Sequence, residues 1–455
     1  MRNKLIVFCL ACLLAFGGVA CTPNGEVSSG VGNSGTESGV EDGGDETQTS
    51  EVLYQMEDVI KEDVMWDSAL FETVPQTKAA EMVYGSALRL EAFKFQSVGY
   101  SKKQLDSTWV FATIGTPSQK KFPMPEGGYP AVILLHGGGG QVYTDWIQWW
   151  TNRGFVALAF DNYANQLNKR GDNVANNEGG PTSHDGPIFD DPNDYTDSWV
   201  YHAVAGTILS NNLLRQRADV DKNRIGLTGI SWGSVIAQIT SGVDKRFAAF
   251  APVYGSGYLY EDENWKNTVS NSSPADQAKG FGGEDKDKWI SLFDPSSYLP
   301  YCTRPTLFVS GIDDNCFCAL NRTRSAALIK GKAFYAQHHD LGHGHVWQKT
   351  PEIYYFFRHV FYGESFDVDL AANVDGNQVT LGYANATFAG VKIVYTTSND
   401  PDSHQWIWET EDVDGVNGKY SYSLPDGVTA FLFETTHTED EYYRTSTKIY
   451  VTEEK

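Results

Sequence analysis

The sequence predicts an α/β fold, a mainly parallel sheet with helices on both faces, followed by a small C-terminal all-β sandwich. From about residue 88 to residue 363, apolar runs of strand length alternate with amphipathic stretches of helical length, which is typical of such a sheet. In the middle of this region, Gly229-Ile230-Ser231-Trp232-Gly233 joins an apolar run to a helical stretch. After Gly363, short aromatic-rich strands alternate with Asp, Gly and Asn turns, which indicates a sandwich.

The first 20 residues have the layout of an export signal. Arg2 and Lys4 precede an apolar run over residues 5–16 that is too short to span a bilayer comfortably. The run ends in Gly-Val-Ala before Cys21, which resembles the cleavage site of a bacterial lipoprotein. We therefore expect a lipoprotein signal peptide over residues 1–20 and a lipid on Cys21. This lipid would anchor the protein to the bacterial envelope, at an outer-membrane, periplasmic or cell-surface face. An ordinary secretory signal cut near the same point is the alternative, and it also exports the protein.

Three segments follow the signal. Residues 21–51 are acidic and rich in Gly and Ser, with almost no apolar side chains, so they cannot bury enough surface to offset the entropy of ordering. We expect a disordered tether there. Residues 52–364 are expected to form the α/β domain, and residues 365–455 the β-sandwich domain.

The charge of the chain excludes some partners. Its 455 residues carry a formal net charge of −23 at pH 7. Nucleic-acid binding needs clustered Lys and Arg to contact phosphates, and an anionic lipid surface would be repelled in the same way. We therefore expect no nucleic-acid partner, and a membrane contact only through the N-terminal lipid.

The expected elements of the α/β domain follow one another along the chain. Residues 131–135 and 155–160 are almost entirely apolar, as strands covered on both faces are. The polar stretch 162–194 is expected to be a long loop over the top of the sheet. Thr350-Pro351 starts a helix whose apolar side chains share one face until Gly363. The expected strands cover 88–98, 108–115, 131–135, 155–160, 224–228, 247–253, 305–310 and 333–336, and the helices 144–153, 197–217, 234–239 and 350–362. The expected strands of the sandwich cover 391–397, 405–409, 419–424, 429–434 and 445–451.

The segment Gly229–Gly233 predicts a nucleophilic serine. A strand, Gly-x-Ser-x-Gly and a helix in succession form a turn so tight that the serine takes a strained backbone conformation and projects its hydroxyl. Small residues flank the serine because strand and helix nearly touch there. A serine hydroxyl is a weak nucleophile at neutral pH, so Ser231 needs a base within hydrogen-bond reach and an acid that orients the base.

A loop after a later strand supplies the acid, since the chain order on such a sheet is serine, acid, histidine. The apolar run 305–310 is followed by Gly311-Ile312-Asp313-Asp314. The acid of such folds usually lies three residues after the glycine, which selects Asp314. Asp313 is the alternative.

The base is expected in the histidine-rich loop 338–345, just before the last helix of the α/β domain. A histidine that directly follows a glycine is the expected base, which selects His343, with His345 as the alternative. A metal site built on His343 and His345 is the competing interpretation. No carboxylate cluster or cysteine completes it convincingly, so we expect no metal and no other cofactor.

An oxyanion hole requires two backbone N–H donors aimed at the developing negative charge. Trp232, directly after the nucleophile, is expected to give one. The glycine-rich loop 136–140 is expected to give the other, and Gly138 is selected as the second residue after the histidine. Glycines let the backbone approach the substrate closely.

Cys9 and Cys12 leave with the signal and Cys21 would carry the lipid, so three cysteines remain: Cys302, Cys316 and Cys318. An odd number rules out a complete disulfide framework. Export favours a bridge from Cys302 to either of the other two, and three free buried thiols are the alternative.

Four blocks of the chain resemble α/β-hydrolases of the acetylxylan esterase-like and dienelactone-hydrolase-like kind. In similar proteins the last block reads His-Gly-His ahead of Pro-Glu-Glu-Ile, with the first histidine as base. The resemblance therefore implies the α/β-hydrolase fold, with Ser231 as nucleophile, His343 as base and Asp314 as acid. It also implies removal of acyl groups from complex polysaccharides. The blocks are Ala131–Gly140 with Trp146 and Trp149, Trp199–Leu214, Arg224–Gly255, and Pro305–Asp314 with Gly342–Pro351.

These observations predict an exported serine esterase that removes acyl groups, above all acetyl, from a carbohydrate or polysaccharide through an acyl-enzyme. A serine peptidase of the prolyl-oligopeptidase type is one alternative, although the chain before residue 131 is far too short for the propeller domain that such enzymes usually carry. A non-catalytic glycan-binding lipoprotein is another alternative, and the complete set of catalytic residue types weighs against it.

Overall fold

The computed structural model describes residues 66, 68–80, 90–162, 177–181, 192–265, 284–366, 369–383 and 386–452. The expected signal peptide, Cys21 and the tether over 21–51 lie outside the described residues, as does most of the loop 162–194. Residues 52–455 form one compact unit. Among the described helices, none combines the length and apolar composition that a bilayer crossing needs.

Within the described residues the main sheet has 14 strands, and the parallel strands at its centre carry the candidate site. Strands β4 to β9 lie in the order β5-β4-β6-β7-β8-β9, and each is parallel to its neighbours. Beyond β5, strands β3, β2 and β1 form an antiparallel edge. All seven residues of β4 are buried, as expected for a strand with helices on both faces. The bounds are β1 (Thr77–Ala79), β2 (Leu90–Ser97), β3 (Thr108–Gly115), β4 (Tyr129–Leu135), β5 (Val156–Phe160), β6 (Val220–Ile230), β7 (Ala249–Val253), β8 (Thr306–Gly311) and β9 (Ala333–His338).

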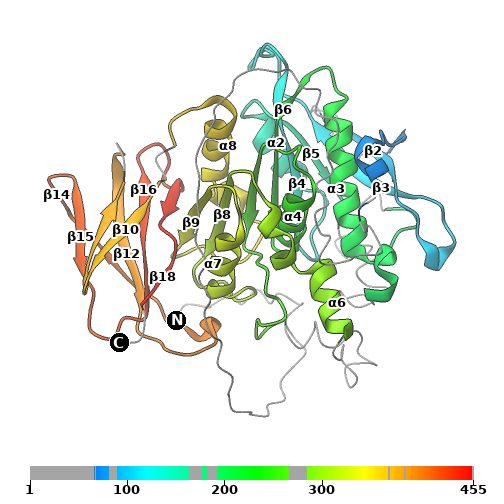
Figure 1. Cartoon of the computed structure of the whole chain (residues 1–455). Helices are drawn as coiled ribbons and strands as arrows, with labels where there is room; N and C mark the ends of the chain where they lie inside the picture. The colour runs from blue at the N-terminus through cyan, green and yellow to red at the C-terminus, as the bar shows by residue number, and fades with distance from the viewer. Residues whose placement is uncertain are drawn as a thin grey trace, which may run out of the picture. The chain divides into compact units, whose positions relative to one another are not determined.

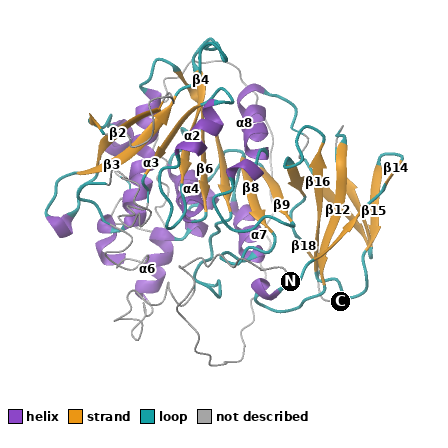
Figure 2. Ribbon diagram, turned by 180° about the vertical axis from the view of Figure 1, so that it is seen from behind, coloured by secondary structure: helices purple, strands orange, loops and turns teal. Residues whose placement is uncertain are grey.

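Helices cover both faces of this sheet (Figures 1 and 2). On one face α2 meets α8, where the rings of Trp150 and Phe357 lie 5.7 Å apart. On the other face α3 packs on α4, where Trp199 meets Trp232 edge to face at 5.7 Å. Gly363 ends α8 with a φ of +68°, which glycine adopts without strain. The bounds are α1 (Ser68–Glu72), α2 (Thr144–Thr151), α3 (Trp199–Arg215), α4 (Trp232–Val243), α6 (Glu284–Phe293), α7 (Ala319–Leu328) and α8 (Glu352–Tyr362).

The C-terminal region is rich in strands and lies beyond β9 (Figure 1). Strands β17, β16, β12 and β13 continue the main sheet past β9, while β10, β11, β15 and β14 form a separate four-stranded sheet. The bounds are β10 (Ala371–Asp375), β11 (Gln378–Gly382), β12 (Phe388–Thr396), β13 (Glu409–Asp412), β14 (Gly415–Val416), β15 (Lys419–Ser423), β16 (Ala430–His437), β17 (Arg444–Ser446) and β18 (Tyr450–Val451).

Strands β12 and β16 are apolar on both faces because each face covers a different core. Ile393 and Phe433 pack with Val379 of the separate sheet, which makes the sandwich. Val394 and Leu432 point the other way, into a cluster that also contains residues of the α/β part. The predicted fold class is therefore confirmed, while the domain boundary at residues 364 and 365 stays a prediction.

Two expected strands of the sandwich differ from the structure. Residues 445–451 do not form one strand, because β17 ends at Ser446 and β18 begins at Tyr450. Residues 405–409 do not form a strand: Ser403–Gln405 is a single 3-10 turn, and β13 begins only at Glu409. The side chain of Asp402 caps the turn by accepting from the N–H of His404. The Trp406 indole N–H donates to the carbonyl of Asp400, 2.8 Å away, which folds the segment back on itself.

Candidate active site

Ser231 occupies the sharp turn between β6 and α4. Its φ of +58° and ψ of −120° are strained for a residue with a side chain. The turn is held because the Ser231 N–H donates to the carbonyl of Val253 on β7, at 2.9 Å, and its carbonyl accepts from Ser234 at 2.8 Å. The serine is thus fixed at the carboxyl ends of the parallel strands, where sites on such sheets usually lie.

The base and acid expected from the sequence meet this serine. The Nε2 atom of His343 lies 2.9 Å from the Ser231 Oγ, and its Nδ1 atom lies 2.8 Å from the Oδ2 of Asp314. The three side chains form one hydrogen-bonded chain from carboxylate to hydroxyl. This is the geometry in which an imidazole can take a proton from the serine while a carboxylate orients it.

Asp314 is set up to remain ionised. Its carboxylate is fully buried, and its Oδ1 accepts from the backbone N–H groups of Cys316 at 2.7 Å and Phe317 at 2.9 Å. Burial opposes ionisation, but the hydrogen bond to His343, its charge and that of Arg322 outweigh it and hold the pKa of Asp314 below its usual value. Asp313, the alternative acid, is exposed and no hydrogen bond joins it to a histidine in the part of the chain described.

His345, the alternative base, contacts the glycine-rich loop instead of the serine. Its Nε2 accepts the backbone N–H of Gly137 at 2.9 Å, and its Nδ1 lies 3.4 Å from the hydroxyl of Tyr143. Burial, reinforced by the charges of His136 and His343, lowers the pKa of His345 to about 3. A neutral imidazole therefore fixes the loop by accepting at Nε2, which places its proton on Nδ1.

The two expected oxyanion donors flank the nucleophile. Trp232 is the first residue of α4, directly after Ser231. Gly138 is exposed in the loop after β4, and a Cβ atom on its neighbour Gly137 would lie 2.9 Å from the Cβ of Ser231. His345 accepts the Gly137 N–H, and the Gly140 N–H donates to the carbonyl of Gly137 at 3.0 Å, so both of these loop donors are already engaged.

Tyr254 packs against His343, the expected base. It follows β7 with a φ of +72°, and its ring lies 4.5 Å from that of His343. Its hydroxyl donates to the carbonyl of Gly342 at 2.8 Å, and burial raises its pKa. Tyr254 therefore both covers the imidazole and holds the loop that carries it. The sequence offered no signal for this role, because an aromatic residue after an apolar strand is usually a core residue.

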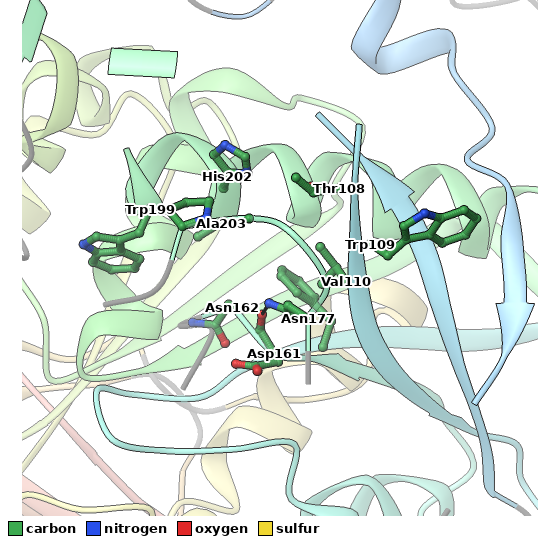
Figure 3. Close-up of a pocket in the computed structure, with 12 residues that line it drawn as sticks. Thr108, Trp109, Val110, Asp161, Asn162, Asn177, Trp199, His202 and Ala203 are labelled. Atoms are coloured by element: carbon green, nitrogen blue, oxygen red, sulfur yellow. Dashed lines mark hydrogen bonds between the residues drawn. The ribbon is translucent and has the colours of Figure 1, made fainter. Parts of the chain in front are cut away.

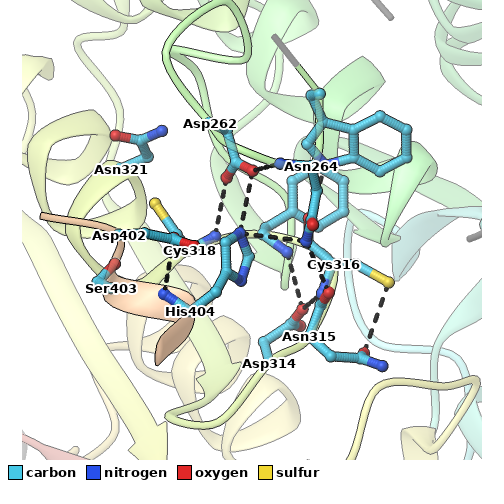
Figure 4. Close-up of polar contacts among 12 residues, drawn as sticks. Asp262, Asn264, Asp314, Asn315, Cys316, Cys318, Asn321, Asp402, Ser403 and His404 are labelled. Atoms are coloured by element: carbon cyan, nitrogen blue, oxygen red, sulfur yellow. Dashed lines mark hydrogen bonds and ion pairs between the residues drawn. The ribbon is translucent and has the colours of Figure 1, made fainter. Parts of the chain in front are cut away.

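A second support was also missed. The Asp262 carboxylate accepts from the N–H of Cys318 at 3.0 Å (Figure 4). The Trp265 indole N–H donates to the carbonyl of Cys316 at 2.6 Å. The ring of Trp265 also lies 5.0 Å from that of Trp232. These residues hold the acid loop, which we define as residues 312–318 between β8 and α7.

The three cysteines are free and buried. Two groups of possible metal ligands have atoms within 4.8 Å of one another, Asp262 with Cys318 and His404, and Asp314 with Cys316 and His343. In each group the carboxylate and the imidazole hydrogen-bond to each other and the carboxylate also accepts backbone N–H groups. Hydrogen bonding thus accounts for the arrangement of both groups.

A small cavity beside the end of β5 is too small for a substrate. It measures about 20 Å³, which is room for about one water molecule, and Asn162, Asn177 and His202 contribute to its lining (Figure 3). Burial lowers the pKa of His202 to about 4, so this side chain is neutral at neutral pH.

The side chain of Asn162 makes two hydrogen bonds to the backbone of His136. It accepts from the His136 N–H at 3.1 Å and donates to the His136 carbonyl at 3.0 Å. These contacts fix the start of the glycine-rich loop.

Comparison with known proteins agrees with this fold. Residues 116–286 match the model of the Dienelactone hydrolase family. No curated protein matches the sequence. Among solved structures, an acetyl xylan esterase from Paenibacillus sp. R4 is similar with a TM-score of 0.51 and 18% identity, over 64% of this chain and 90% of that chain. Acetyl xylan esterase 1 from Thermoanaerobacterium sp. JW/SL YS485 gives a TM-score of 0.50 and 14% identity, over 64% of this chain and 92% of that one.

Proposed function

Because the chain has the α/β-hydrolase fold and is similar to dienelactone hydrolases and acetyl xylan esterases, we propose that it is a serine esterase that removes acyl groups from a carbohydrate. The observation that carries this proposal is the hydrogen-bonded chain from Asp314 through His343 to Ser231. The similarity to two acetyl xylan esterases favours acetyl as the acyl group and a xylan-like polysaccharide as its carrier.

The first half-reaction transfers the acyl group to the enzyme. Ser231 Oγ attacks the ester carbonyl carbon while His343 Nε2 takes the hydroxyl proton. The carbonyl oxygen becomes an oxyanion that accepts the backbone N–H groups of Trp232 and Gly138. The C–O bond to the sugar then breaks, and the imidazolium returns its proton to the departing sugar oxygen.

The second half-reaction releases the acid. Water attacks the acyl-enzyme while His343 takes one of its protons, and a second oxyanion forms in the same place. When the bond to Ser231 breaks, the proton returns to Oγ and the carboxylic acid leaves. Throughout, Asp314 keeps the Nδ1–H of His343 in place and balances the positive charge of the imidazolium.

Export and anchoring belong to the same proposal. The charged and apolar residues before Cys21 support secretion, and a lipid on Cys21 would hold the enzyme at the bacterial envelope, where it could meet polysaccharides. The acidic stretch after Cys21 supports a tether that keeps the enzyme away from an anionic membrane surface.

Acid release from an acetylated oligosaccharide tests this function. Wild-type protein should release acetate from acetylated xylo-oligosaccharides and from 4-nitrophenyl acetate. Ser231→Ala should lower kcat on both by roughly 10³-fold or more. Ser423→Ala, at an exposed serine on β15, is the matched control and should keep wild-type rates. Wild-type rates in Ser231→Ala, or faster cleavage of amides than of esters, would overturn the proposal.

A further inference from the structure

A pocket of about 300 Å³ lies between the acid loop and a segment of the C-terminal region. We call it the acid-loop pocket. Residues 312–315 form one wall, and residues 403, 404 and 406–408 form the other. Its volume is at the lower end of the range for small-molecule sites and is far larger than that of the cavity beside β5.

The pocket is joined to the catalytic chain through one residue. Asp314 belongs to its lining, and the same residue hydrogen-bonds His343 at 2.8 Å. The acid loop follows the carboxyl end of β8, on the edge of the sheet where the turn after β6 presents Ser231. The pocket and the turn that carries Ser231 therefore lie at the same edge of the sheet.

The wall from the C-terminal region is fixed in place. The Nε2 of His404 lies 3.0 Å from the carboxylate of Asp262 (Figure 4). The Ser403 hydroxyl accepts from the N–H of Leu320 at 3.3 Å. Asp262 in turn holds the acid loop through Cys318. The two walls are thus tied to each other, and a preformed site binds without a large cost of ordering.

The lining combines aromatic surface with polar groups. Trp408 is half-buried and its ring lies 5.6 Å from that of the buried Trp406, while Ile407 is 80% exposed. Asp313 and Asn315 are exposed at the other wall. An indole face packs on the apolar face of a sugar ring, and carboxylate and amide groups hydrogen-bond its hydroxyls.

The charges of the pocket favour a neutral ligand. No lysine or arginine occurs among its described lining residues, the imidazole of His404 is paired with the carboxylate of Asp262, and Asp313 contributes an exposed carboxyl group. Repulsion from Asp313, added to a net charge of −23, disfavours uronic acids, nucleotides and acidic peptides. A neutral sugar unit has the mixture of apolar face and hydroxyl rim that these walls complement.

We propose that the acid-loop pocket binds a neutral sugar unit of the glycan whose ester is cleaved at Ser231. This inference rests on the proposed esterase function and assigns the C-terminal region a role in substrate selection. It makes the enzyme an oligosaccharide or polysaccharide esterase, with cleavage that becomes more efficient when the chain is long enough to reach Trp408.

The test compares a substrate that can reach the pocket with one that cannot. The value of kcat/KM is measured for acetylated xylo-oligosaccharides of increasing length and for 4-nitrophenyl acetate. Trp408→Ala should lower kcat/KM about tenfold on the longer oligosaccharides, mainly through KM, and leave 4-nitrophenyl acetate within about twofold of wild type. Ile407→Asp is the second variant, since a side chain that is 80% exposed can be replaced without disturbing the fold. Tyr442→Ala, at an aromatic residue that is 40% exposed elsewhere on the C-terminal region, is the control and should match wild type on both.

The possible results separate the two proposals. Wild-type protein that hydrolyses neither substrate contradicts the esterase function itself. If the wild-type kcat/KM on oligosaccharides does not depend on their length, the pocket assignment alone is overturned. The same holds if the variants alter kcat/KM on neither substrate, or lower it equally on both. Fluorescence titration of Ser231→Ala with unacetylated xylohexaose gives an independent readout, because binding should disappear in Ser231→Ala combined with Trp408→Ala. The pocket assignment would also be overturned if xylohexaose did not bind and an apolar peptide bound in a way that depends on Trp408.

Discussion

A Cβ atom on Gly229 would lie 2.2 Å from the carbonyl oxygen of Gly233. A Cβ atom on Gly233 would in turn lie 2.2 Å from the carbonyl oxygen of Leu135. Three backbone segments, β6, α4 and the end of β4, therefore touch around the turn that carries Ser231. This close approach, rather than a positive φ at either glycine, explains why the turn has a glycine on each side.

Gly229→Ala should destabilise the protein because neither backbone can move away without disrupting the sheet or the helix. We expect a loss of about 2 kcal/mol or more in the free energy of unfolding, measured by urea denaturation. Gly390→Ala is the control, since no atom lies within 4 Å of its Cβ position, and it should stay within about 0.5 kcal/mol of wild type. Equal stability of the two variants would contradict the close contact.

A comparison of Asp314→Asn with Asp313→Asn should show which carboxyl group of the acid loop acts on His343. Asp314→Asn removes the charge that balances the imidazolium of His343, so kcat on 4-nitrophenyl acetate should fall by about 10³- to 10⁴-fold. Asp313→Asn should keep the rate on this small ester within about threefold of wild type, since Asp313 is exposed. A large loss in Asp313→Asn with a small one in Asp314→Asn would transfer the role of acid to Asp313.

His345→Phe should impair catalysis without removing the base. It leaves the buried N–H of Gly137 without its acceptor, which should cost about 1–3 kcal/mol of stability and loosen the loop that contains Gly138. We expect kcat on 4-nitrophenyl acetate to fall roughly tenfold with little change in KM. His345→Gln offers an acceptor near the position of Nε2 and should recover much of this loss. If both variants fell as far as Ser231→Ala, His345 rather than His343 would be the base.

The contact between His404 and Asp262 should make stability depend on pH. Burial and the positive charge of Arg322 both lower the pKa of His404. The hydrogen bond to Asp262 and the negative charges of Asp262 and Asp402 outweigh them, so the pKa of His404 is raised above the usual 6.5. The stabilisation is therefore full below pH 6.5 and is lost as the pH rises through the raised value. The difference in unfolding free energy between wild type and His404→Gln, followed by urea denaturation, should be largest near pH 6 and shrink toward pH 9. A difference that grows with pH would contradict the protonated pair.

The parts of the site that the sequence predicted are local. The turn around Ser231 depends on five consecutive residues. The candidate residues Asp314 and His343 lie in loops that follow β8 and β9, whose carboxyl ends meet at one edge of the sheet. Their side chains were expected to converge for that reason. The choice between His343 and His345 was harder, since both lie in the same loop and only the structure separates their partners.

The parts that the sequence did not predict depend on contacts between distant segments. Pairing of Tyr335 on β9 with Ser446 on β17 joins the C-terminal strands to the main sheet, and nothing in either segment indicates the other. The same holds for Asp262 and His404, which are 142 residues apart. The acid-loop pocket exists because of these contacts, so its walls could not be identified from either segment alone.

Covalent labelling with a fluorophosphonate tests the central claim most directly, since the reagent reacts only with a serine activated by its neighbours. Mass spectrometry of the digested wild-type protein should find the phosphonyl group on the peptide that contains Ser231. Labelling should be lost in Ser231→Ala and strongly slowed in His343→Ala. An unlabelled wild-type protein that is correctly folded, or a label on a different residue, would contradict the account.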